Sequence, residues 1–241
     1  MKELYFEKID STNTYLKEHY SELEDMCIVA ADYQYAGKGR NDRKWTAEEK
    51  LNLTFSLLIK DEEVIRNYKA LSVLSAYSIV QVLNKYGIKG SMIKWPNDVY
   101  VDDKKICGIL LESVSKEKIE CLIVGIGLNV NQIVFAGTYL REPTSMKKEL
   151  HKDIDLLKLK EEIYRQLDDN ILALKQGHDF YEEISSYDYL KNKTAKANLD
   201  GQLKTVKIIG ISEDYSLRCE CEGMIRDIES GEISFHQGDC Q

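Results

Sequence analysis

A tight acidic turn between two apolar runs limits the kind of sheet that this chain can form. Residues 99–101 are apolar, the pair Asp102-Asp103 follows, and a second apolar run covers residues 106–112. This pattern is typical of a β-hairpin, whose two strands are antiparallel. Because a doubly wound fold joins parallel strands through crossover helices, the hairpin favours a mixed or antiparallel central sheet with helices, an α+β fold.

Other strands and helices are predicted from apolar patterning in the first part of the chain. Strands are expected at residues 26–31, 51–59, 93–95 and 118–131. Helices are expected at residues 15–20, at 64–86 before a C-cap at Gly87, at 153–176 with Asp153 as the cap, and at 178–190. The polar residues 35–50 predict a loop, and residues 138–151 carry no strong pattern.

The character of the chain changes after Asn192, where short strands alternate with turn signals. The strand candidates are residues 205–210, 217–221, 224–229 and 233–236. Such spacing is typical of a small all-β barrel or sandwich. The sequence therefore predicts two domains, residues 1–190 and residues 191–241.

Charge and hydropathy argue against several classes of protein. The formal net charge of -8 is unsuited to general binding of nucleic acid, whose phosphates need a basic surface. No apolar stretch is long enough to span a bilayer, and the N-terminus has no signal-peptide pattern, so we expect a cytoplasmic protein. The six cysteines include no Cys-x-x-Cys pair, and a zinc site at Cys219 and Cys221 would need His236 and Cys240, so reduced structural thiols are favoured.

A basic glycine loop runs from Gly37 to Trp45. It contains four cations, Lys38, Arg40, Arg43 and Lys44, and one acid, Asp42. Glycines let backbone amides approach a ligand, and arginine presents a planar fork to carboxylate or phosphate. The spacing is not that of a Walker A loop. The loop therefore indicates either a site for two reacting anions or an ordinary solvated turn.

A second motif, Lys94-Trp95-Pro96-Asn97-Asp98, is followed by Lys105 and Gly108. Pro96 cannot continue a sheet ladder, so the chain must turn there. Asn97 and Asp98 then either face a ligand or a magnesium ion, or form a common Asn-Asp turn.

Two weaker signals come from glycines and from a helix start. Gly125 and Gly127 alternate in a buried strand, which indicates either close packing against the backbone or a bulge. Ser11-Thr12-Asn13 can cap a helix, and the same groups can bond a polar ring such as a ureido group.

In order and spacing, these motifs resemble those of the biotin–protein ligase family, which includes holocarboxylase synthetases. The similarity runs from residue 5 to 131 and more loosely through residues 230–234. It implies a class II synthetase-like ligase domain and a C-terminal SH3-like barrel. It also implies conversion of biotin and ATP, with Mg²⁺, to biotinyl-5'-AMP, and transfer of biotin to a lysine of a biotin carboxyl carrier protein or domain. The carrier would belong to acetyl-CoA carboxylase or pyruvate carboxylase, and a homodimer is possible in this family.

The resemblance assigns expected roles to individual residues of this chain. Lys105 and Arg40 are the expected catalytic residues, and Asp98 is the expected magnesium ligand. The residues expected to bind biotin are Ser11, Thr12, Asn13, Gln34, Gly37, Lys38, Gly39, Arg40, Lys105 and Gly108. Those expected to bind ATP are Arg40, Arg43, Lys44, Trp45, Asn97, Asp98, Lys105 and Asn129.

Three positions depart from the family pattern. Lys38 and Asp42 stand where the family loop usually has arginine and glycine, and His236 stands where an arginine often follows the last motif. The motifs begin at Ser11, so we expect a short form without an N-terminal DNA-binding domain. The alternatives are a lipoate or octanoate ligase of related fold, a non-catalytic biotin sensor, and a binder of single-stranded nucleic acid.

Overall fold

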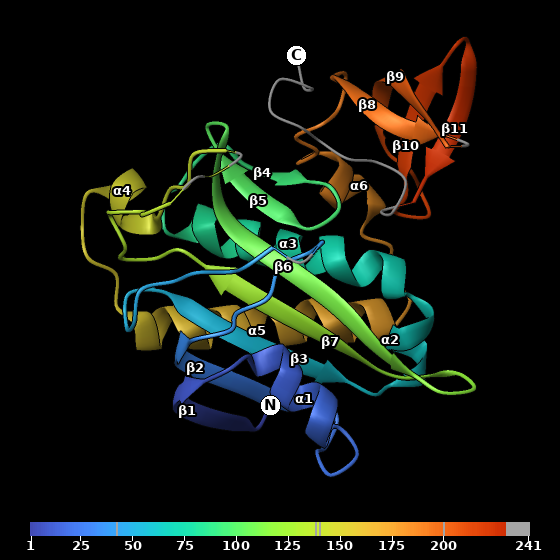
Figure 1. Ribbon diagram of the computed structural model, residues 1–241. Coiled ribbons are helices and arrows are strands. Elements are labelled where there is room, and N and C mark those ends of the chain that lie inside the picture. The colour runs from blue at the N-terminus through green and yellow to red at the C-terminus, as the bar shows by residue number, and fades with distance from the viewer. Residues whose placement is uncertain (42, 138, 140, 200, 230–241) are drawn as a thin grey trace.

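A seven-stranded mixed sheet forms the centre of the computed structural model, which describes residues 1–41, 43–137, 139, 141–199 and 201–229 (Figure 1). Its strands are β1 (Glu3–Ile9), β2 (Ile28–Gln34), β3 (Leu53–Ile59), β4 (Ser91–Lys94), β5 (Asp98–Val101), β6 (Lys104–Ser115) and β7 (Ile119–Leu128). The order is β1-β2-β3-β7-β6-β5-β4. β1 and β2 are parallel and the other neighbours are antiparallel, so the predicted mixed sheet is confirmed.

The predicted hairpin is present between β5 and β6. Val101 pairs with Lys104, which leaves Asp102 and Asp103 as a two-residue turn. Their φ angles are 46° and 64°, the left-handed values that the common two-residue hairpin turns require. Aspartate tolerates this region better than most residues, which explains why this pair supports the turn.

Six helices are described: α1 (Thr12–His19), α2 (Glu62–Arg66), α3 (Tyr68–Lys85), α4 (Met146–Leu150), α5 (Leu156–Lys175) and α6 (Tyr181–Ser185). α3 and α5 cover one face of the sheet and α1 lies on the other (Figure 1). In β2, Ile28 and Ala30 pack in the large cluster with α3 and α5, whereas Cys27 just before the strand and Val29 within it pack with Leu16 of α1. Because both faces of the sheet are covered here, the first four residues of β2 are all apolar and buried.

Several predicted helix limits were wrong. The helix expected over residues 64–86 is two helices, because Asn67 leaves the helical conformation with φ -96° and ψ 28°. Asp155, and not Asp153, caps α5 by accepting hydrogen bonds from the N–H groups of Leu157 and Lys158. The helix expected over 178–190 is only the short α6, and the predicted helix at 15–20 begins earlier, at Thr12. β1, α4 and β8 were not predicted.

A second sheet contains β8 (Thr194–Leu199), β9 (Gln202–Ile211), β10 (Leu217–Cys221) and β11 (Met224–Ile228). Its order is β11-β10-β9-β8 and every pairing is antiparallel, as expected for an all-β C-terminal part. The strand predicted at 233–236, together with Asp42, His236 and Cys240, lies outside the described residues. The division between residues 190 and 191 remains a prediction.

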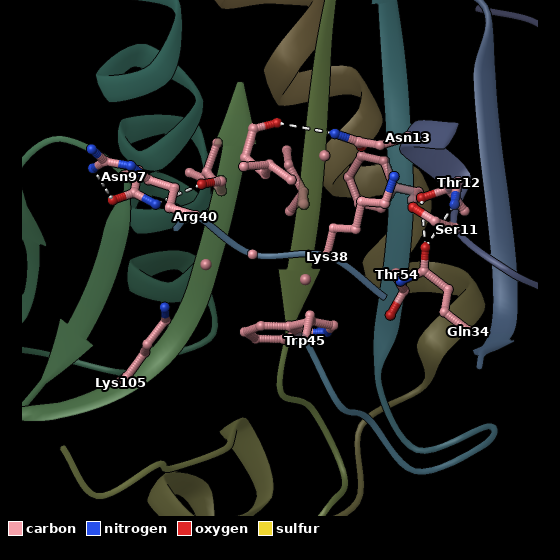
Figure 2. Close-up of a pocket in the computed structure, with 18 residues that line it drawn as sticks. Ser11, Thr12, Asn13, Gln34, Lys38, Arg40, Trp45, Thr54, Asn97 and Lys105 are labelled. Carbon is pink, nitrogen blue, oxygen red and sulfur yellow. Dashed lines mark hydrogen bonds between the residues drawn. The ribbon is translucent and has the colours of Figure 1, made fainter. Parts of the chain in front are cut away.

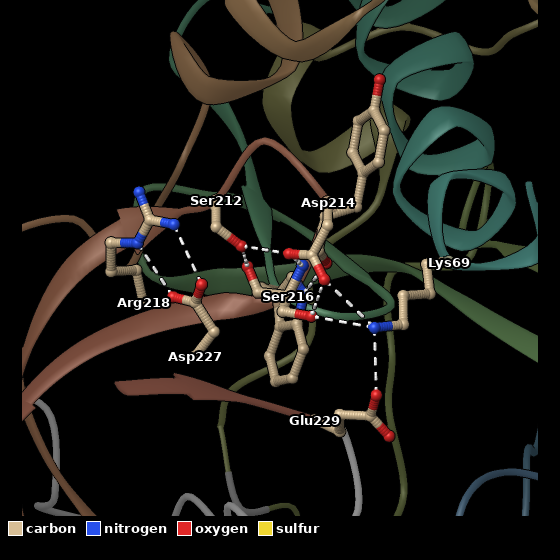
Figure 3. A network of polar contacts seen from close by, with 9 residues as sticks. Lys69, Ser212, Asp214, Ser216, Arg218, Asp227 and Glu229 are labelled. Atoms are coloured by element: carbon tan, nitrogen blue, oxygen red, sulfur yellow. Dashed lines mark hydrogen bonds and ion pairs between the residues drawn. The ribbon is translucent and has the colours of Figure 1, made fainter. Parts of the chain in front are cut away.

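Polar contacts join the second sheet to α3 and to the β4–β5 turn (Figure 3). Lys69 Nζ of α3 lies 3.1 Å from Asp214 Oδ2 and 3.0 Å from Glu229 Oε1. The indole N–H of Trp95 donates to the carbonyl of Tyr215 at 2.9 Å. The turn between β9 and β10 is thereby held against the motif that contains Asn97 and Asp98.

Two further observations concern membranes and thiols. Among the described helices, none is both long and apolar enough to cross a membrane. Five cysteines are described, and all are buried free thiols. Within that part of the chain, no group of three or more histidine, cysteine or acidic side chains is arranged to hold a metal ion.

Candidate functional site

The separate sequence motifs meet around one cavity on the face of the sheet that carries α1 (Figure 2). The start of α1, the end of β2, the basic loop, the β4–β5 turn, the start of β3, the first half of β6 and the last part of β7 all contribute. The volume is about 60 Å³. The lining residues are Ser11, Thr12, Asn13, Gln34, Lys38, Gly39, Arg40, Trp45, Thr54, Phe55, Asn97, Lys105, Gly108, Ile109, Leu110, Gly125, Ile126 and Gly127.

The register of the sheet creates two rows across the floor of this cavity. Gly125 of β7 stands between Ser56 of β3 and Leu110 of β6. Two residues further along β7, Gly127 stands between Thr54 and Gly108. Since side chains alternate along a strand, both rows face the cavity.

Each of the two alternating glycines is covered by a side chain from another part of the protein. A Cβ atom on Gly125 would lie 2.3 Å from Asn13 Oδ1, and one on Gly127 would lie 2.2 Å from Trp45 Cε2. Both distances are far inside van der Waals contact. The predicted close packing against this strand is therefore confirmed, and it comes from α1 and from the basic loop.

Neutral hydrogen-bonding groups form one end of the cavity. Ser11 Oγ accepts from the N–H of Thr14 at 3.4 Å and caps α1. Gln34 Oε1 accepts from the N–H of Thr12 at 2.7 Å and from its hydroxyl at 3.0 Å. The helix start thus performs capping and also faces the cavity, so the two interpretations of Ser11-Thr12-Asn13 do not exclude each other.

Both ends of the Asn13 amide are occupied by protein groups. Nδ2 donates to Glu112 Oε2 at 2.8 Å, and Oδ1 accepts from Ser56 Oγ at 2.5 Å. Sequence reasoning missed Ser56 and Glu112 as parts of this site. A usable signal existed for each, because Thr54 and Ser56 are polar at alternate positions of an apolar strand, and Glu112 is the acidic residue that ends the otherwise apolar run 106–112.

Cations form the other end of the cavity. Arg40 Nη1 donates to Asn97 Oδ1 at 3.2 Å, and desolvation by burial, followed by repulsion from Arg43, lowers the pKa of Arg40. Lys105 Nζ lies 2.7 Å from Asp98 Oδ1 and 5.8 Å from the ring centre of Trp45. A half-buried guanidinium and an ammonium therefore converge where an anionic ligand would be stabilised.

The basic loop folds back on itself and lies across the cavity. The N–H of Gly39 donates to the carbonyl of Arg43 at 2.7 Å, and the N–H of Trp45 donates to that of Gly37 at 3.0 Å. Trp45 rests on the glycine row, and its buried indole N–H has no hydrogen-bond partner among the described residues. Buried tryptophan usually has such a partner, so a ligand could complete this position.

Several expected site residues do not line the cavity. Arg43 and Lys44 are exposed. Gly37 is buried, and a Cβ on this residue would lie 2.5 Å from the carbonyl oxygen of Trp45. Asn129 is buried and its amide donates to the carbonyl of Thr144 at 3.0 Å. Their assignments to biotin or ATP remain predictions.

Asp98 can serve Mg²⁺ only as part of a larger ligand set. It is one carboxylate, and the ammonium group of Lys105 already lies beside it. Mg²⁺ in nucleotide sites is commonly held by one or two carboxylates together with substrate phosphates and water. Asp98 therefore fits an ion that arrives with a nucleotide better than one held by the protein alone.

A second cavity of about 410 Å³ lies beside the first and shares Arg40 and Asn97 with it. Its other walls include Lys69 of α3, Trp95 and Tyr215. The two cavities thus adjoin at the cationic end of the smaller one.

Comparison with known proteins gives consistent matches. The model of the biotin/lipoate A/B protein ligase family matches residues 5–129. The bifunctional ligase/repressor BirA of Escherichia coli (strain K12) is 29% identical over 245 residues, which cover 96% of this chain and 73% of that protein. A biotin–[acetyl-CoA-carboxylase] ligase of Paracoccus denitrificans is 30% identical over 154 residues, covering 61% of this chain and 64% of that protein.

Among solved structures, the biotin protein ligase from Aquifex aeolicus in complex with biotin and ATP has a TM-score of 0.83. It is 29% identical, and the alignment covers 98% of this chain and 99% of that one. The similarity therefore extends over both sheets.

Proposed function

Because this chain belongs to the biotin/lipoate A/B protein ligase family, we propose that it is a biotin–protein ligase. It activates the carboxylate of biotin with ATP to form biotinyl-5'-AMP. It then transfers the biotinyl group to a lysine of a biotin carboxyl carrier protein or domain, such as that of acetyl-CoA carboxylase or pyruvate carboxylase.

The observation that carries the proposal is the polarity of the cavity along its length. Thr12 and Gln34 offer neutral hydrogen-bonding groups at one end, whereas Arg40 and Lys105 offer positive charge at the other. Biotin has a ureido ring at one end and a carboxylate at the other. The dithiolane ring of lipoate would leave Thr12 and Gln34 without ligand partners, which is unfavourable for buried polar groups.

Activation joins two anions, and the cations of the site offset their repulsion. A carboxylate oxygen of biotin attacks the α-phosphorus of ATP, an acyl–phosphate bond forms, and pyrophosphate leaves. Lys105 and Arg40 stabilise the negative charge on the carboxylate and phosphate oxygens, and no covalent bond to the enzyme is needed. Asp98 would hold Mg²⁺ together with the phosphates of the nucleotide, and the ion would supply further neutralisation of phosphate charge.

Trp45 lies on the nucleotide side of the site in this proposal. Its ring is held flat against Gly127 and near Gly108, where a Cβ would lie 3.1 Å from Trp45 Cζ3. A base that stacks on such a ring gains about 1–3 kcal/mol. The unpartnered indole N–H is then free to contact the bound nucleotide.

The basic loop controls access and shields the adenylate. Ligand pockets commonly measure about 300–1,000 Å³, whereas this cavity measures about 60 Å³. The loop from Gly37 to Trp45 therefore has to open to admit substrates. When it closes again it excludes water from the mixed anhydride, which hydrolyses readily.

The second half-reaction forms an amide bond. The unprotonated amine of the carrier lysine attacks the acyl carbon of biotinyl-AMP, a C–N bond forms, the acyl–phosphate bond breaks, and AMP leaves as the amine loses a proton. The larger cavity beside Arg40 and Asn97 gives a second substrate a route to the reacting end.

The decisive experiment measures the mass of a carrier domain after incubation with this chain, ATP, Mg²⁺ and biotin. We expect a gain of one biotinyl group, and no gain when the acceptor lysine of the carrier is replaced by arginine. Lipoate in place of biotin serves as the matched ligand control. No gain with biotin, or an equal gain with lipoate, would contradict the proposal.

A further inference from the structure

Glu112 lies at one end of a chain of hydrogen bonds that runs from β6 to β2. It accepts from Asn13, whose oxygen accepts from the hydroxyl of Ser56. Ser56 Oγ lies 2.6 Å from Thr12 Oγ1, which lies 3.0 Å from Gln34 Oε1. Asn13, Ser56 and Thr12 are each less than 5% exposed, so water hardly competes for these bonds.

Glu112 and the carbonyl of Leu110 determine how the amide of Asn13 is oriented, because Nδ2 donates to Glu112 at 2.8 Å and to Leu110 O at the longer distance of 3.4 Å. The other oxygen of Glu112 is ion-paired with Lys17 Nζ, and an ionised carboxylate can only accept hydrogen bonds. The atom of Asn13 that faces Glu112 must therefore be the amide nitrogen, and the amide oxygen faces Ser56. Because that oxygen also only accepts, the single hydroxyl proton of Ser56 is committed to Asn13.

At the opposite end of the hydrogen-bond chain, the orientation of the Gln34 amide is determined by a backbone N–H group. The N–H of Thr12 donates to Gln34 Oε1 at 2.7 Å, so this amide also has one orientation. The hydroxyl of Thr12 then lies between two acceptors, Ser56 Oγ and Gln34 Oε1, and its single proton is shared between them. Neither neighbour has a proton to donate in return, so the lone pairs of Thr12 Oγ1 remain available to an N–H group in the cavity.

We propose that Glu112 is a positioning residue, which keeps the Thr12 hydroxyl an acceptor for the N–H groups of a cyclic urea. The inference rests on the proposed function, since the ureido ring of biotin supplies those donors. Without the charge of Glu112, only the longer bond from Asn13 Nδ2 to the carbonyl of Leu110 opposes a turn of the Asn13 amide. Ser56 then donates to Thr12 and occupies one of the two lone pairs of its hydroxyl, which leaves a poorer acceptor for the ligand.

The first test is Glu112→Gln, which retains the size of the side chain and removes its charge. We expect the KM for biotin in pyrophosphate release to rise about tenfold, as for one mismatched buried hydrogen bond. The KM for ATP and kcat change little, because the side chain of Glu112 bonds Asn13 and Lys17, and Arg40 and Lys105 keep their contacts with Asn97 and Asp98. The matched control is Glu120→Gln on β7, where Glu120 bonds Tyr20 and Lys116 away from the cavity, and it leaves the KM for biotin unchanged.

The second test is a double variant that should recover biotin binding. No recovery is expected if Glu112 contributes only to packing. In the double variant Asn13→Asp with Glu112→Gln, the carboxylate at position 13 accepts from Ser56 and from the amide at position 112. The bond between positions 13 and 112 is reversed, but Ser56 again donates to position 13, and Thr12 keeps the bonding that it has in the wild type. Asn13→Asp alone opposes two carboxylates, so we expect both single variants to bind biotin worse than the double variant.

A third measurement does not need biotin. In the ligand-free protein, the side-chain amide of Asn13 gives one pair of NMR signals, and in Glu112→Gln the pair is doubled or broadened by exchange. This change supports the role of Glu112 even if the wild type fails to bind biotin, a failure that would overturn only the proposed function. An unchanged KM for biotin in Glu112→Gln, or a folded double variant without recovery, overturns the role of Glu112.

Discussion

Replacing Gly127 with alanine tests whether the two glycine rows divide the site between its two small substrates. The new Cβ would lie 2.2 Å from Trp45 Cε2, and the ring must retreat to the 3.4 Å of ordinary contact, a shift of about 1.2 Å. Gly127 has no positive φ, so the effect is steric and not a backbone strain. Because Trp45 is on a loop that can move, we expect a loss of stability of only about 1 kcal/mol.

The expected functional effect is large and selective. A ring displaced by that distance loses its stacking on the nucleotide, which is worth about 1–3 kcal/mol. The KM for ATP should therefore rise about tenfold or more, while the KM for biotin changes little. Initial rates of biotin-dependent pyrophosphate release, with each substrate varied in turn, measure both constants.

Gly125→Ala is the matched control on the same strand. Its new Cβ would lie 2.3 Å from Asn13 Oδ1, so the same chemical change disturbs the hydrogen-bonded end instead. Here the KM for biotin should rise and that for ATP should stay nearly constant. If both variants raise the same constant, or if Gly127→Ala acts mainly on biotin, the division of the site into two rows is refuted.

Three other variants test the cationic end and the contact between the sheets. Lys105→Ala should slow biotin-dependent pyrophosphate release by about a hundredfold, and a near-normal rate would contradict a catalytic role. Arg40→Gly should speed the escape of biotinyl-AMP about tenfold or more, and an unchanged dissociation rate in a filtration assay would argue against a latch. Hydrogen bonds, chiefly from Ser212 and then from Lys69 and Ser216, lower the pKa of Asp214, so its stabilising contribution is present above about pH 4 and is lost as the pH falls. The difference in urea stability between wild type and Asp214→Asn should accordingly shrink below that pH, and a constant difference would contradict this origin.

Local chemistry in the sequence was enough to predict some elements in detail. The acidic pair Asp102-Asp103 adopts left-handed backbone angles that suit a two-residue turn, and this preference belongs to the residues themselves. The apolar runs of β3 and β7 indicate burial on both faces without any knowledge of their neighbours. The start of α5 was harder to predict. Asp153 and Asp155 can both cap a helix, so the sequence alone does not identify which of them does.

The candidate site was likewise predictable only in part from the sequence. The residue types of the basic loop and of Lys94-Trp95-Pro96-Asn97-Asp98 indicated anion chemistry before any fold was known. Their spacing did not show that Arg40 bonds Asn97 or that Arg43 and Lys44 face solvent. Such differences depend on how the loop turns over the sheet.

The sequence by itself determined the hairpin, the order of the motifs and the charge of the reacting end, because these follow from properties of neighbouring residues. Only the tertiary structure decided which groups face one another inside the cavity. Asn13 and Glu112 are 99 positions apart, and they meet because α1 packs on β3 and β7 and β6 lies beside β7 in the sheet. That register places Asn13 over Gly125 and Trp45 over Gly127, and no local pattern can specify a contact that depends on which strands are neighbours.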